Sequence, residues 1–82
     1  MTIPITFEFQ GKQFSGEFSD VMGAGNTAIF HLSINRFYYG RLRYSQFEGG
    51  WVFDTNAGSV GWEVLAEQFG YHLIAWYDCH LK

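Results

Sequence analysis

The chain has a single cysteine, Cys79, so it cannot form an internal disulfide or a zinc site built from several cysteines. A lone thiol is typical of proteins in a reducing compartment, and we therefore expect a cytoplasmic protein. The first residues, MTIPITFEF, lack the basic start and the long apolar core of a signal peptide, which predicts that the whole chain is the mature protein. No apolar run approaches the roughly 20 residues of a membrane-spanning helix, so we expect no membrane association.

Basic residues are also few. The chain contains five Lys and Arg residues and eight Asp and Glu residues, which gives a formal net charge of −3. Non-specific binding to phosphates needs a basic surface, so nucleic acid is not the partner that we expect. The acidic residues are in turn too few to make the chain a polyanionic mimic.

Aromatic residues are what the chain has in excess. Nine Phe, five Tyr and three Trp make up 21% of 82 residues, and the hydrophobic fraction is 48%. This composition predicts one domain, residues 1–82, with a core of its own, and it favours strands over helices. Ten glycines suit the tight turns of an antiparallel sheet, and the single proline, Pro4, indicates an edge or the start of a strand.

The first hairpin follows from the alternation of residues 2–10, where Ile3, Ile5, Phe7 and Phe9 share one face. A type II′ turn at Gly11-Lys12 would pair Phe9 with Phe14 and Ile5 with Phe18, all on the apolar face. A third strand is expected at residues 27–34, with Phe30, Leu32 and Ile34 directed inward.

The second hairpin contains a conflict in the stretch FYYGRLRY, residues 37–44. A two-residue loop at Asn35-Arg36 would bring Arg41 and Arg43 onto the core face, where unpaired guanidinium groups are costly. A three-residue loop, residues 35–37, keeps both arginines outside and pairs Leu32 with Gly40 and Phe30 with Leu42. We therefore predict the longer loop, and we note that a β-bulge would reconcile both patterns.

The third hairpin is expected to turn at Glu48-Gly49. That register pairs Tyr44 with Phe53 on the core face and sets Arg43 directly opposite Asp54 on the outer face. Opposite charges across a strand pair support it by less than about 1 kcal/mol.

After Asp54 the pattern changes to that of a helix over about residues 60–69, with Ser59 as its N-cap and Gly70 as its C′ residue. The tail, about residues 71–78, alternates large apolar residues on both faces and predicts a final strand beside the fifth or the first. The fold class that we predict is α+β: an antiparallel five-stranded β-meander, one C-terminal α-helix packed on one face, and this last β-strand.

The outer face of the sheet carries the candidate interaction surface. With Tyr38, Leu42 and Tyr44 in the core, and Arg43 paired with Asp54, the residues left for a partner are Ile29, His31, Phe37, Tyr39 and Arg41. Tyr and Arg are favoured anchors of protein interfaces. The sequence therefore predicts a small interaction module of the accessory, inhibitor or immunity type, which self-associates as a homodimer or binds a protein partner.

Two other functions stay open at this point. Single-stranded nucleic acid could stack on the Tyr39 and Arg41 face, and a small ligand could bind in an aromatic pocket between helix and sheet. Catalysis, a cofactor and a metal ion are not expected. Cys79 lacks a catalytic motif, and Asp78 and His80, although they share a face of the expected last strand, are too few to hold zinc.

Overall fold

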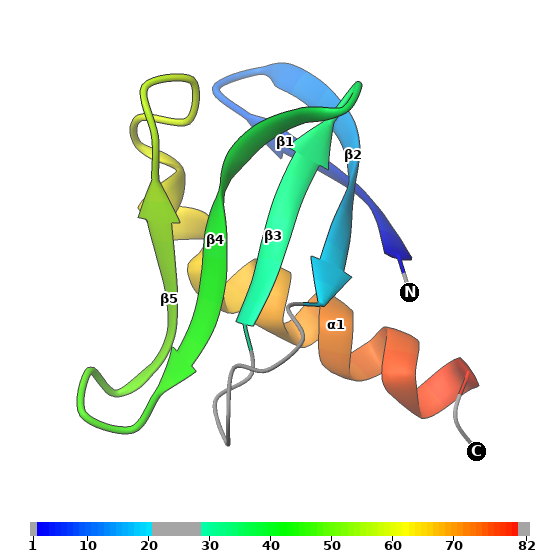
Figure 1. Cartoon of the computed structure of the whole chain (residues 1–82), viewed down its shortest axis with the longest axis vertical. Coiled ribbons are helices and arrows are strands. Elements are labelled where there is room, and N and C mark those ends of the chain that lie inside the picture. The colour runs from blue at the N-terminus through cyan, green and yellow to red at the C-terminus, as the bar shows by residue number, and fades with distance from the viewer. Residues whose placement is uncertain (1, 21–28, 81–82) are drawn as a thin grey trace.

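The computed structural model describes residues 2–20 and 29–80, which form one five-stranded sheet and one helical segment (Figure 1). The strands are β1 (Thr2–Phe9), β2 (Lys12–Asp20), β3 (Ile29–Ile34), β4 (Phe37–Ser45) and β5 (Gly50–Thr55). They pair antiparallel in chain order, and the helical segment covers one face of the sheet. The predicted α+β meander with a C-terminal helix is confirmed. Residues 27 and 28 of the expected third strand lie outside the described residues.

The helical segment starts with a short 3-10 helix, η1 (Trp62–Leu65), and continues as the α-helix α1 (Ala66–His80). Its first residue is preceded by Gly61, whose φ of 92° is left-handed. The predicted N-cap, Ser59, is instead fully buried, and its Oγ accepts a hydrogen bond from the backbone N–H of Asn56 at 3.0 Å. The helical segment therefore begins two residues after the predicted start, about residue 60.

The predicted final strand, about residues 71–78, is wrong because α1 runs through these positions. Leu73 is buried one turn after Phe69, so the apolar stripe continues at helical spacing where the alternation suggested a strand. Gly70 does not end the helix. A Cβ atom there would lie 2.3 Å from Cδ1 of Trp51, so the glycine is needed for the close approach of β5 to α1.

The core lies between the sheet and the helical segment. Phe69, which is fully buried, packs with ring centroids 5.0 Å from Phe7, 5.4 Å from Phe18 and 5.4 Å from Phe53. Trp62 extends this cluster to Phe14. The Phe69 ring of α1 thus contacts one aromatic residue on each of β1, β2 and β5.

The first hairpin keeps the predicted apolar face but not the predicted register. Phe7, and not Phe9, lies opposite Phe14, and Ile3 lies opposite Phe18. The turn residues are Gln10 and Gly11, both with positive φ (51° and 78°), as in a type I′ turn. A shift of two residues in the pairing leaves every side chain on its expected face.

Phe69→Ala is predicted to destabilise the protein by about 3–5 kcal/mol, because it removes the ring that three strands share. Gln68→Ala, an exposed change on the same helix, is the matched control and should cost less than about 0.5 kcal/mol. Urea unfolding followed by tryptophan fluorescence measures both. Similar losses for the two variants would contradict the packing described above.

Candidate functional site

The β3–β4 hairpin contains the β-bulge that the sequence allowed. The turn is Asn35-Arg36, with φ of 53° and 70°, so the predicted three-residue loop is wrong. The register then shifts between Leu32 and Ser33, and Leu32 lies opposite Gly40 as predicted. Ser33 lies opposite Tyr38, which leaves the intervening Tyr39 as the extra residue.

The bulge reverses the predicted orientation of the two neighbouring tyrosines. Tyr39 stacks on Trp62 on the helix side, with ring centroids 5.5 Å apart and ring planes 13° apart. Tyr38, expected in the core, is 50% exposed, and its ring meets His31 edge to face at 5.1 Å. Tyr38 therefore takes the place on the outer face that the sequence assigned to Tyr39.

The loop after β5 contacts both tyrosines of the bulge, Tyr38 and Tyr39. The Asn56 side-chain amide donates to the carbonyl of Tyr38 at 2.7 Å, and Asn56 Oδ1 accepts from the N–H of Gly58 at 2.9 Å. Gly58 lies under the Tyr39 ring, so that a Cβ there would be 3.2 Å from Tyr39 Cε1. These contacts fix Tyr38 and Tyr39 on opposite faces.

We use the name outer face for the surface of the sheet opposite α1. Of the predicted surface residues, Ile29, His31 and Arg41 lie on it, with His31 directly opposite Arg41 and Ile29 directly opposite Arg43. Tyr39 lies on the helix side. Phe37 is 70% exposed at the start of β4, where it pairs with Ile34, a residue of the core face.

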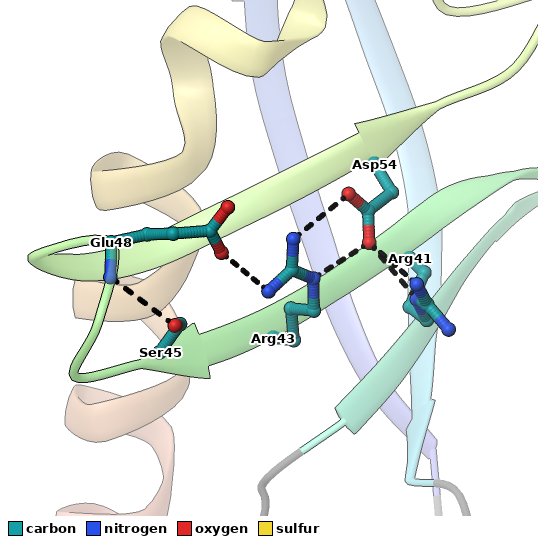
Figure 2. A network of polar contacts seen from close by, with 5 residues as sticks. All are labelled: Arg41, Arg43, Ser45, Glu48 and Asp54. Atoms are coloured by element: carbon teal, nitrogen blue, oxygen red, sulfur yellow. Dashed lines mark hydrogen bonds and ion pairs between the residues drawn. The ribbon is translucent and has the colours of Figure 1, made fainter.

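Two arginines and two carboxylates form a network on the outer face of β4 and β5 (Figure 2). Asp54 Oδ2 accepts from Nε and Nη2 of Arg41 at 3.0 and 2.8 Å, and from Nε of Arg43 at 2.8 Å. Arg43 Nη1 donates to Glu48 at 2.6 Å. The predicted pairing of Arg43 with Asp54 is present, but the predicted register is wrong: Arg41 is the residue directly opposite Asp54, and Leu42 is opposite Phe53.

The network shifts the pKa values of Asp54 and Arg43. Hydrogen bonding from Arg43 is the largest influence on the Asp54 carboxyl and lowers its pKa from 3.8; burial opposes this change, and Arg41 adds to it. Hydrogen bonds to Asp54 and Glu48 raise the pKa of Arg43 above its ordinary value. The two guanidinium charges are therefore balanced by two carboxylates within the protein.

The same network orders the tip of the β4–β5 hairpin, residues 46–49. Glu48, which binds Arg43, also donates its backbone N–H to Ser45 Oγ at 3.3 Å (Figure 2). The N–H of Gly49 donates to the carbonyl of Gln46 at 3.4 Å. Phe47 stands fully exposed at this tip.

Neither groups of metal ligands nor membrane-spanning helices are found in the described parts of the chain. Residues 2–20 and 29–80 contain no group of three or more His, Cys, Asp or Glu side chains arranged to hold a metal ion. Asp78 and His80 do not share a strand face, because both positions lie in α1. Neither described helix has the length and apolar character required to cross a bilayer.

Comparisons of the chain with protein-family models, with curated proteins and with solved structures found no match. The candidate site is therefore inferred from the positions and contacts of its own residues.

Asp54→Asn is predicted to destabilise the protein by about 1 kcal/mol near neutral pH, because it weakens the exposed pairs with Arg41 and Arg43. The native pKa of Asp54 is lowered, so its stabilising effect is present above the unfolded-state pKa and is lost as the pH falls through the native value. The difference between wild type and variant should therefore shrink below about pH 4.

Urea unfolding between pH 2.5 and 7 measures this difference. Glu8→Gln is the matched control, because it removes an exposed carboxylate from the same face without touching the network. A difference between Asp54→Asn and wild type that stays constant down to pH 2.5 would show that the network does not contribute as described.

Proposed function

We propose that the protein is a small, non-enzymatic interaction module that pairs with a second copy of itself through the outer face. The observation that supports this most is the side on which the helix packs. The C-terminal segment covers the opposite face of the sheet, so none of the described elements lies over Ile29, His31 and Tyr38 (Figure 1). A face with aromatic, apolar and arginine side chains is suited to a protein partner.

The outer face combines aromatic, apolar and arginine side chains, the residue types that are common in protein interfaces. His31 and Tyr38 are in contact, and Ile29 and Val52 flank Arg43 on the neighbouring strands. These side chains are only partly accessible in the monomer, apart from Tyr38, so ordering them on binding costs little entropy. Tyr38 is the most exposed aromatic group of this face and is the expected anchor.

The order of the strands allows a second copy to pair face to face with the outer face. Glu8 of β1 and Glu17 of β2 are exposed near one edge, and the half-exposed Arg41 lies toward the other. Face-to-face pairing about a two-fold axis parallel to the strands sets each edge against the opposite edge of the other copy. Glu8 and Glu17 of one copy then lie over the strand of its mate that carries Arg41, whose guanidinium group is already paired with Asp54.

Single-stranded nucleic acid is a weaker candidate for this face. Asp54 binds both Arg41 and Arg43, and Glu48 binds Arg43 as well, so a phosphate would compete with carboxylates already in place. Tyr39, the ring expected to stack on a base, is in contact with Trp62. A small ligand between helix and sheet is likewise disfavoured, because Phe69 and its three neighbouring rings fill that space.

We also propose a cytoplasmic location and an accessory, inhibitor or immunity-type role. The location is supported by the one cysteine, Cys79, which is free and exposed on α1. The role is proposed by analogy with other compact single-domain proteins, on the basis of the 82-residue length alone.

Light scattering across a concentration series tests the proposal, and we expect a mass approaching twice the 9.5 kDa of the monomer. Tyr38→Ala should weaken the dimer about tenfold or more, the loss typical of an anchor residue. Tyr71→Ala is the matched control, since Tyr71 is 65% exposed on the helix. A monomeric mass up to millimolar protein, or equal weakening by both variants, would overturn the proposal.

A further inference from the structure

The side of α1 that faces solvent carries apolar residues that the fold does not use. Tyr71 is 65% exposed and Ile74 is 49% exposed, and Val64 of the preceding η1 is 75% exposed. The opposite side of α1 packs on the sheet through Phe69 and Leu73. A helix lying on a sheet normally presents polar residues to water, so α1 is apolar on two sides.

Two of these residues, Tyr71 and Ile74, are flanked by acids at helical spacing. Glu67, Tyr71, Ile74 and Asp78 follow one another at intervals of four, three and four residues, and all four are exposed. Residues at these intervals lie along one side of an α-helix. We call them the helix stripe.

The charge of this region has one sign. Glu63, Glu67 and Asp78 are exposed, and the sequence contains no Lys or Arg between residues 55 and 80. His72 lies outside the stripe, and its Nε2 is 2.7 Å from the carbonyl oxygen of Pro4 in β1.

This charge decides between the possible occupants of the helix stripe. A second copy would bring two acidic helices together, and an anionic membrane surface would be repelled in the same way. A basic segment is attracted, and its apolar residues can cover Tyr71 and Ile74. An amphipathic helix fits best, because it presents residues at the same spacing as the stripe.

We propose that the helix stripe is a docking site for a basic amphipathic helix of another protein. Leu-like side chains of that helix pack on Tyr71 and Ile74, and its Lys or Arg side chains pair with Glu67 and Asp78. This site lies on the side of the molecule away from the outer face, so a dimer formed through the sheet would keep both copies of it accessible.

The test uses the full-length ¹⁵N-labelled protein and a synthetic 14-residue peptide of leucine and lysine in an amphipathic helical pattern. We expect amide shift changes concentrated in residues 67–78. Tyr71→Ser or Ile74→Ser should weaken binding about tenfold, as for a buried anchor. Glu67→Gln should weaken it several-fold, while its control Glu8→Gln, an equal charge change on the outer face, should not.

Three results would overturn the proposal: no shift changes, shift changes confined to the outer face, or unchanged affinity in both serine variants. The last would mean that the peptide is held by charge attraction alone. A fourth result, equal binding of the same peptide with glutamate in place of lysine, would contradict the proposal as well. The mass of the protein, measured separately, reports on pairing through the sheet, so the failure of one proposal is distinguishable from the failure of the other.

Discussion

The packing of Phe69 against rings of β1, β2 and β5 is the interaction on which the rest of the structure depends. It sets the helical segment on one face of the sheet and thereby leaves the outer face without cover from any described element. Gly70 takes part, because only a residue without a side chain lets Trp51 approach the helix this closely. A sheet with one helix has one buried face and one open face, and the function that we propose uses the open one.

The β-bulge at Tyr39 connects the core to that open face. One extra residue in β4 sends Tyr39 to Trp62 and Tyr38 to His31, so a single backbone irregularity serves both sides of the sheet. Gly40 makes the bulge possible, since its φ is 144° and a Cβ there would lie 2.7 Å from the carbonyl oxygen of Asp54. Directly after the bulge, Arg41 lies opposite Asp54.

Much of the sheet could be predicted from the sequence, because alternation assigns faces even when the register is wrong. The pairing of the first hairpin differs from the expected one by two residues, and such a shift keeps Phe7 in the core and Phe14 packed against it. A shift of one residue is more serious. The bulge produces such a shift between Leu32 and Ser33, and it exchanges the expected positions of Tyr38 and Tyr39.

The tail was predicted wrongly for a different reason. Its large residues fit a strand at period two, but Phe69, Leu73 and Tyr77 also fit a helix at intervals of four. The local sequence predicts Gly70 as a helix terminator. Its contact with Trp51 joins residues 19 positions apart in the chain, and no local pattern reports such a contact. Of the candidate surface, Ile29, His31 and Arg41 lie on the outer face as predicted, because the bulge does not disturb the alternation at these three positions.

Isotope-filtered NMR on a mixed sample of labelled and unlabelled protein tests the central claim most directly, because it detects contacts between copies. We predict intermolecular nuclear Overhauser effects from the side chains of Ile29, Tyr38 and Val52. Effects from Tyr71 or Ile74, or their complete absence at millimolar concentration, would contradict the assignment of the outer face as the surface on which two copies meet.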